Sequence, residues 1–225
     1  MVLLAPATLL IGSLIALAIV LDSPGPVFYR AERVGLGGRR FAMLKFRKMR
    51  RDERGLPLTV GADHRFTPIG RFLSLTRLDE LPQLWNVVRG DMRLIGPRPE
   101  LPEFVDRYPE PYAEILTVVP GITGLAQLQS AGEAAALAEI DDPVTHYCDE
   151  LLPVKIGLDI AYVRERSMSG DLRILAMTLV LPITVRRTGS PRRLSRQNPL
   201  TVFSAVTSVA TLVLLATFAW AVSLI

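Results

Sequence analysis

The most informative stretch of this chain is Leu78-Asp79-Glu80-Leu81-Pro82-Gln83-Leu84, which places two carboxylates shortly before a proline. Proline is tolerated in the first turn of a helix but not in its interior, so Pro82 predicts a helix start. Apolar residues continue at helical spacing through Val88, and Gly90 ends the pattern. We therefore expect a short helix from Pro82, with Asp79 and Glu80 at its N-terminus.

Two further elements precede this stretch. Thr67-Pro68 joins a capping hydroxyl to a proline at the first helical position, which predicts a short helix over residues 69–75. Further upstream, two runs rich in apolar and aromatic residues, 27–29 and 41–46, flank a glycine-rich turn at residues 35–38. This pattern indicates a β-hairpin with basic residues on its arms, which we expect near a membrane surface.

Downstream, prolines and glycines divide the chain into short elements. Gly96-Pro97-Arg98-Pro99 holds an arginine between two prolines in an extended loop, and residues 120–124 predict a tight loop. Helical patterns cover residues 102–108, 112–118, 132–140 and 151–166. An apolar segment at 171–185 is helix-like, but we expect Pro182 to break it and the segment to lie at a membrane interface. The predicted fold is α+β and mostly helical, with a small β-hairpin and interfacial helices.

Apolar runs without charge occupy both ends of the chain, at residues 1–21 and 199–225. Each is long enough for the roughly 20 residues that a membrane-spanning helix needs. Five arginines between 186 and 198 precede the second run, which predicts a cytoplasmic start for it. We divide the chain into an N-terminal membrane helix (1–22), a core (23–185), a basic linker (186–198) and a C-terminal transmembrane helix (199–225).

Composition narrows the classes of partner. The net charge is +4, and basic residues concentrate between 30 and 54, so we expect anionic partners. The single cysteine, Cys148, excludes an internal disulfide, and two histidines are too few for a His/Cys metal site. The chain lacks the aromatic platforms and motifs typical of nucleic-acid binding, so we expect no nucleic-acid partner.

Several features point to phosphate chemistry. The carboxylates of Asp79 and Glu80 stand next to a predicted helix N-terminus, which favours anions, and Arg98 is clamped between prolines. A carboxylate can act as a nucleophile, and a neighbouring one can hold Mg²⁺. An arginine can contact phosphate oxygens through two donors. Lys45 and Arg47 add a basic stretch that could serve the same site.

Simpler readings stay open at this point. Asp79 and Glu80 could only cap a helix, which stabilises by roughly 1 kcal/mol. Arg98 could pair with Glu100 or Glu103, and the basic stretch could contact anionic lipid. Two other functional classes are a membrane-anchored binding protein without turnover and a phosphohydrolase in which water attacks an aspartyl intermediate.

The order of the motifs is more specific than any one of them. In chain order they are Ser23-Pro24-Gly25-Pro26-Val27-Phe28-Tyr29-Arg30, Leu44-Lys45-Phe46-Arg47, Leu78-Asp79-Glu80-Leu81-Pro82-Gln83-Leu84, Gly90-Asp91-Met92, Gly96-Pro97-Arg98-Pro99 and Pro120-Gly121-Ile122-Thr123-Gly124-Leu125. This order resembles the bacterial sugar transferase family of monotopic phosphoglycosyl transferases. The resemblance covers about residues 5–185.

The resemblance implies a membrane-associated monotopic core with a re-entrant N-terminal helix. It implies that Asp79 attacks the β-phosphate of a UDP-sugar and releases UMP, and that undecaprenyl phosphate then takes the phosphosugar. Such a transfer starts the assembly of a glycan (exopolysaccharide, O-antigen, capsule or glycoprotein). Glu80 would bind Mg²⁺, and Arg98, Lys45 and Arg47 would bind substrate phosphate. The implied location is the cytoplasmic face of the bacterial inner membrane, in contact with anionic lipid; a homo-oligomer stays open.

The sequence also departs from the family pattern. Ala31 and Lys48 stand where glutamine and threonine are usual, and residues 127–130 follow the pattern loosely, so the choice of substrate stays open. Ala5-Pro6 corresponds to the break at the midpoint of the re-entrant helix. The first half of that helix has no counterpart. Either the natural start lies upstream, which we expect, or residues 1–21 span the bilayer with Met1 outside.

Overall fold

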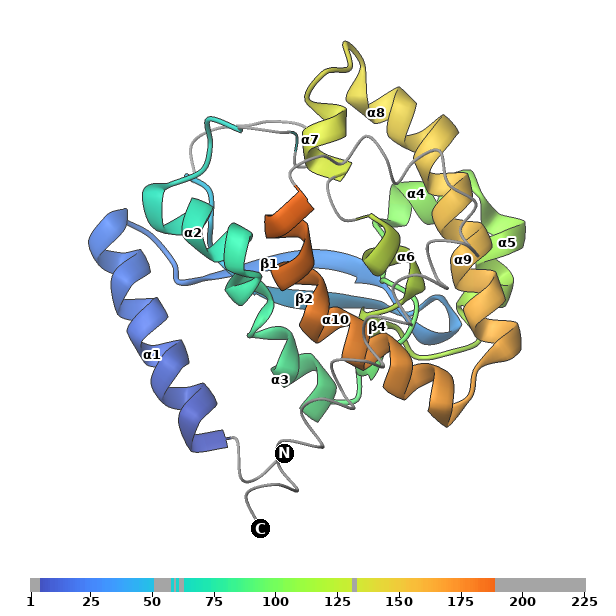
Figure 1. Ribbon diagram of the computed structural model, residues 1–225, viewed down its shortest axis with the longest axis horizontal. Helices are drawn as coiled ribbons and strands as arrows, with labels where there is room; N and C mark the ends of the chain where they lie inside the picture. Colours follow the sequence, from blue (N-terminus) through green and yellow to red (C-terminus); the bar gives the residue numbers. More distant parts are fainter. Residues whose placement is uncertain (1–4, 51–57, 59, 61–62, 131–132, 189–225) are drawn as a thin grey trace.

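The structure, a computed structural model, describes residues 5–50, 58, 60, 63–130 and 133–188. In chain order its elements are α1 (Ala5–Asp22), β1 (Phe28–Val34), η2 (Leu36–Gly38), β2 (Arg40–Phe46), α2 (Pro68–Thr76), η3 (Leu78–Glu80), α3 (Gln83–Val88), β3 (Arg93–Ile95), α4 (Pro102–Arg107), α5 (Pro109–Ile115), β4 (Gly121–Thr123), α6 (Leu125–Gln129), α7 (Glu133–Leu137), α8 (Pro143–His146), η4 (Tyr147–Leu151), α9 (Leu152–Glu165) and α10 (Met168–Thr188). The hairpin β1–β2 runs through the middle of the view in Figure 1, with α1 and α2 on one side and α5, α8 and α9 on the other. The expected α+β, mostly helical fold is confirmed.

The predicted β-hairpin is confirmed. β1 and β2 pair antiparallel, with Ala31 opposite Met43. Both side chains are buried and pack against Met92, which follows α3. The turn between the strands is the 3-10 turn η2, in which Gly37 has a positive φ of 63° that glycine adopts without steric cost. The hairpin is thus joined to the segment that follows the Asp79–Glu80 motif.

A second, two-stranded sheet joins segments that the sequence presents as separate loops. β3 and β4 run parallel. The Gly96 amide donates to the Thr123 carbonyl at 2.9 Å, and the Gly121 amide donates to the Pro97 carbonyl at 2.8 Å. A Cβ on Gly121 would lie 2.1 Å from the Gly96 nitrogen, so this close approach requires glycine. The expectation of a tight loop at 120–124 is wrong, because pairing with a distant segment extends the chain there.

The helix starts signalled by proline are confirmed. Thr67 caps α2 by accepting a hydrogen bond from the Gly70 amide at 2.9 Å, with Pro68 at the first helical position. α3 begins directly after Pro82 and ends at Val88, as the apolar spacing predicts. α2 and α3 therefore bracket the turn that carries the two carboxylates.

α1 carries apolar side chains both where it packs on the molecule and on its exposed surface. Ile15 and Ile19 pack with Phe46 and Leu73, which attaches the helix to the hairpin and α2. Its outward-facing large side chains are Leu9, Leu10, Ile11, Leu14, Leu17, Val20 and Leu21. No helix in the described part of the chain has both the length and the apolar character needed to cross a membrane. The re-entrant course expected of the N-terminal helix stays a prediction.

The other side of the molecule has its own core, between α4, α5, η4 and α9. Its buried members are Phe104, Tyr112, Ile115, Leu137, Tyr147, Cys148, Leu152 and Ile156.

Farther along, α10 runs unbroken from Met168 to Thr188, so the expected break at Pro182 is wrong. An internal proline removes one hydrogen bond and commonly kinks a helix, but the helix can continue past it. The predicted transmembrane helix at 199–225, and the linker from residue 189 on, lie outside the described residues.

Candidate active site

Asp79 and Glu80 lie in a 3-10 turn of their own. This turn, η3, follows α2 across Arg77, whose backbone is left-handed (φ 60°, ψ 11°). Such a conformation is uncommon for a residue other than glycine, and it redirects the chain sharply. After the turn, Asp79 is almost fully buried, with 2% of its surface exposed. The local backbone thus turns the first carboxylate inward.

Neither carboxylate caps a helix. No side-chain hydrogen bond caps η3 or α3, and the residue at the N-cap of α3 is Pro82. The capping alternative is therefore wrong. The expected helix N-terminus at the pair is also corrected, because α3 begins three residues after Glu80 and is six residues long. So short a helix has few aligned peptide dipoles, and the positive potential at the pair comes instead from side chains.

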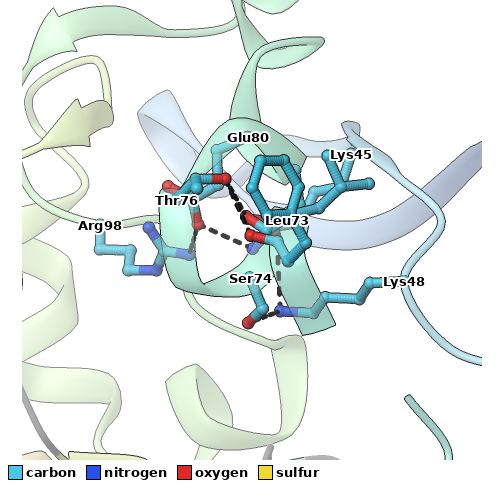
Figure 2. A network of polar contacts seen from close by, with 9 residues as sticks. Lys45, Lys48, Leu73, Ser74, Thr76, Glu80 and Arg98 are labelled. Atoms are coloured by element: carbon cyan, nitrogen blue, oxygen red, sulfur yellow. Dashed lines mark hydrogen bonds and ion pairs between the residues drawn. The ribbon is translucent and has the colours of Figure 1, made fainter. Parts of the chain in front are cut away.

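Two cations converge on one oxygen of Glu80. Lys45 Nζ lies 3.0 Å from Glu80 Oε1, and Arg98 Nη2 lies 2.8 Å from the same atom (Figure 2). Lys45 comes from the end of β2, whereas Arg98 follows β3 in the segment that β4 holds in place. The ion pair found for Arg98 is thus with Glu80 rather than with Glu100 or Glu103.

Burial and charge act in opposite directions on these groups. Burial raises the pKa of Glu80, but the charges of Arg98 and Lys45 outweigh it and hold that pKa well below its usual value. Burial, together with the charge of Arg98, lowers the pKa of Lys45 to about 8. The charge of Glu80 raises the pKa of Arg98. At neutral pH the cluster holds an ionised Glu80 and a permanently charged Arg98, and Lys45 is the group that titrates nearest to neutrality.

Asp79 has a cation of its own, which the sequence interpretation did not include among the site residues. Lys48 Nζ lies 3.2 Å from Asp79 Oδ2 and 3.5 Å from Ser74 Oγ. It also lies 5.6 Å from the centre of the Phe66 ring. In Figure 2 the Lys48 side chain reaches toward Ser74 at the base of the cluster. The only signal in the sequence was a lysine where the family pattern has threonine.

Arg47 is not brought into this cluster. Its Nη1 donates to the Pro24 carbonyl at 2.7 Å, and its Nη2 donates to the carbonyl and hydroxyl oxygens of Ser23 at 2.6 and 3.0 Å. A Cβ on Gly25 would lie 2.2 Å from Arg47 Nη1. The motif Ser23-Pro24-Gly25 therefore folds around this guanidinium, which fastens the chain after α1 to the end of β2. Phosphate binding by Arg47 stays a prediction that these contacts do not favour.

Asn86 supports the strand that carries Lys45. The Asn86 Oδ1 atom accepts from the Leu44 amide at 3.0 Å, and Nδ2 donates to the Ala42 carbonyl at 2.9 Å. The residue is 1% exposed, so these bonds join α3 to β2 in a dry interior. Sequence reasoning missed Asn86; its signal was an amide within the apolar spacing of the helix.

The expected magnesium ligand is Glu80. Both cations contact its Oε1, and no hydrogen bond from the described residues reaches Oε2. The described residues include no group of three or more His, Cys, Asp or Glu that could hold a metal ion. Mg²⁺ is commonly bound by one or two carboxylates together with substrate phosphates and water. The pair Asp79–Glu80 fits that mode of binding only with a phosphorylated substrate present.

In the described part of the chain, the cluster contains three cations, Lys45, Lys48 and Arg98, which form ion pairs with the two carboxylates of Asp79 and Glu80. An excess of positive charge that combines the planar guanidinium of arginine with the ammonium groups of lysine is typical of proteins that bind phosphorylated compounds. The comparison of sequences makes the class specific. This chain belongs to the bacterial sugar transferase family, whose sequence model matches residues 1–184, and the resemblance is confirmed.

Several relatives carry named activities. The chain is 41% identical over 172 residues to the UDP-glucose:undecaprenyl-phosphate glucose-1-phosphate transferase of Caulobacter vibrioides, covering 74% of this chain and 60% of the relative. A protein of the same name from Escherichia coli is 37% identical over 73% of this chain and 34% of its own length. The UDP-N-acetylgalactosamine-undecaprenyl-phosphate N-acetylgalactosaminephosphotransferase of Aeromonas hydrophila is 38% identical, over 73% of this chain and 37% of the relative. The chain thus spans between about a third and 60% of these relatives.

Proposed function

We propose that this protein transfers a sugar-1-phosphate from a UDP-sugar to undecaprenyl phosphate and so starts the assembly of a glycan such as an exopolysaccharide, O-antigen, capsule or glycoprotein glycan. The observation that carries the proposal is the buried pair Asp79–Glu80, in which Asp79 contacts one cation and Glu80 contacts two others. The names of the relatives support the same donor and acceptor classes. Helix capping does not explain the pair.

In the proposed first step, an Asp79 carboxylate oxygen attacks the β-phosphorus of the donor. A bond forms between that oxygen and phosphorus, the bond from the β-phosphorus to the bridging oxygen breaks, and UMP leaves with the bridging oxygen and its electron pair. In the second step, a phosphate oxygen of undecaprenyl phosphate attacks the same phosphorus and releases the Asp79 carboxylate. Nearby cations favour an ionised nucleophile and reduce its repulsion from the anionic diphosphate.

Different side chains would serve different parts of this reaction. Arg98 and Lys45, which lie 2.8 and 3.0 Å from Glu80, would contact donor phosphate oxygens on that side of the pair. Glu80 is the residue that would hold Mg²⁺ together with the donor phosphates. When bound there, the ion would neutralise part of the diphosphate charge.

The acceptor requires access to a membrane. α1 exposes apolar side chains along its length, and α2 and α3 expose Phe72, Leu75, Trp85 and Val88. Large exposed apolar patches are typical of surfaces that bind membranes or other proteins. We place this surface in the cytoplasmic leaflet of the bacterial inner membrane, with α1 inserted and anionic lipid near the basic residues of the hairpin.

A labelling experiment tests the proposal. The protein in detergent is incubated without acceptor with UDP-glucose, UDP-galactose or UDP-N-acetylgalactosamine, each labelled in the sugar, and with Mg²⁺. We expect one donor to release UMP and to leave label on a peptide containing Asp79, and added undecaprenyl phosphate to remove it. Asp79→Asn should bind donor but acquire no label. Turnover by the Asp79→Asn variant at the wild-type rate would contradict the proposed nucleophile. Release of free sugar phosphate into water by the wild type, at its rate of turnover, would favour a phosphohydrolase.

A further inference from the structure

The nucleophile proposed above has a neighbouring cation to which the proposed reaction gives no individual part. Lys48 Nζ lies 3.2 Å from Asp79 Oδ2, whereas Lys45 and Arg98 both contact Glu80. The two carboxylates therefore have separate cations. Lys48 stands where the family pattern has threonine, so family membership does not account for this charge.

The backbone at Lys48 is fixed by the start of α2. The Thr67 amide donates to the Lys48 carbonyl at 3.1 Å, and Met49 forms an antiparallel bridge with Phe66. A Cβ on Gly70 would lie 1.9 Å from the same carbonyl oxygen, so α2 packs directly on this segment. The position of the Lys48 side chain thus follows from the packing of α2 against the chain that leaves β2.

The ammonium group of Lys48 has a donor left for a ligand. A lysine ammonium carries three N–H donors, and the structure directs it toward Asp79 and Ser74. The Lys48 side chain is 21% exposed, whereas that of Asp79 is 3% exposed. An anionic ligand that approaches the buried carboxylate therefore meets the lysine first.

We propose that Lys48 binds the diphosphate of the donor while it remains next to Asp79, so that one ammonium group bridges the nucleophile and the reacting phosphate. This inference rests on the proposed function. The bridge offsets the repulsion between the carboxylate and the diphosphate, which are both negative, and brings them together in the geometry of attack. Threonine at this position would lack the charge.

Two measurements test the bridge in the chain of 225 residues. The first is the affinity for UDP, which carries the diphosphate common to all donors of this class. The second is the rate at which label appears on Asp79 at a saturating concentration of the donor found in the labelling experiment. We expect Lys48→Met to weaken UDP binding about ten-fold and to slow labelling about 100-fold, as for the removal of one preorganised donor. Lys48→Arg should recover most of both, because it keeps the charge.

The control is Lys155→Met, which removes a similarly buried lysine that pairs with Glu133 at 2.7 Å. It should leave UDP affinity and labelling rate within about two-fold of wild type. Thermal unfolding identifies any variant that has failed to fold. Unchanged UDP affinity in folded Lys48→Met would overturn the inference, since a lysine that only orients Asp79 does not contact the ligand. An equal loss in Lys48→Arg would also overturn it. If the wild type binds UDP but no donor labels Asp79, the proposed function fails and the UDP comparison still tests Lys48.

Discussion

Replacing Glu80 by glutamine should destabilise the protein as well as stop transfer. Glu80 supplies the negative charge for Lys45 and Arg98, and the three side chains are 13%, 13% and 24% exposed, respectively. Removing one partner of a buried ion pair costs about 3–5 kcal/mol, because it leaves an uncompensated charge. Lys45 can escape part of this cost by losing its proton, since its pKa is already about 8. Arg98 cannot, so we expect a loss of about 3 kcal/mol.

Urea unfolding in detergent, followed by tryptophan fluorescence, measures this loss. The matched control is Glu114→Gln, which removes a carboxylate that is 35% exposed and pairs with the more exposed Arg164 at 2.7 Å, and which should cost far less stability than Glu80→Gln. Adding Lys45→Met to Glu80→Gln should restore part of the stability, because one of the two unpaired cations is gone. A loss below about 1 kcal/mol for Glu80→Gln, or no recovery in the double variant, would refute the reasoning from a shared buried charge.

Three further outcomes follow from the site. Burial lowers the pKa of Lys45 from 10.5 to about 8, so the rate of transfer should fall as pH rises through about 8. The free energy of unfolding should rise between about pH 8 and 10.5, because only the unfolded chain keeps the proton in that range. Profiles of rate and of unfolding against pH check both effects, and Lys45→Arg should move the fall in rate to higher pH. Arg98→Lys should lower kcat/KM at least about ten-fold, because a point charge replaces a planar fork, and steady-state UMP release measures it. Gly121→Ala should destabilise by about 1–3 kcal/mol in urea unfolding, whereas Gly157→Ala, with no atom within 4 Å of the added Cβ, should not destabilise.

Local signals predicted the elements that form through local contacts. The hydroxyl of Thr67 with Pro68, and the proline at 82, gave the starts of α2 and α3 because caps and prolines act within one turn. The glycine-rich turn predicted the hairpin, because a turn of this kind also depends on residues close together in the sequence. The order of the motifs gave Glu80, Arg98 and Lys45 as candidates, and the structure brings these three together.

Contacts between distant segments could not be predicted in the same way. The pairing of β3 with β4 depends on the close approach of Gly96 and Gly121, which are far apart in the sequence. The ion pair of Lys48 with Asp79 depends on how α2 packs against the end of β2. Arg47 looked equivalent to Lys45 as a basic residue, and only the fold of the chain around Pro24 separates them. A sequence pattern lists charges without giving the direction of each side chain.

The hydrogen bonds of Arg47 have a further consequence for where the reaction takes place. Arg47 holds the chain that leaves α1, and Lys45, two residues earlier, contacts Glu80. With α1 inserted in a bilayer as proposed, this two-residue step fixes the height of the carboxylates above the lipid headgroups. The proposed acceptor is a lipid whose phosphate stays at the headgroup level, so donor and acceptor would meet only if the site is held at that level. Arg47 and Lys45 thus hold the end of α1 and the site at a fixed separation, and a residue inserted between Lys45 and Arg47 would change the distance of the site from the bilayer.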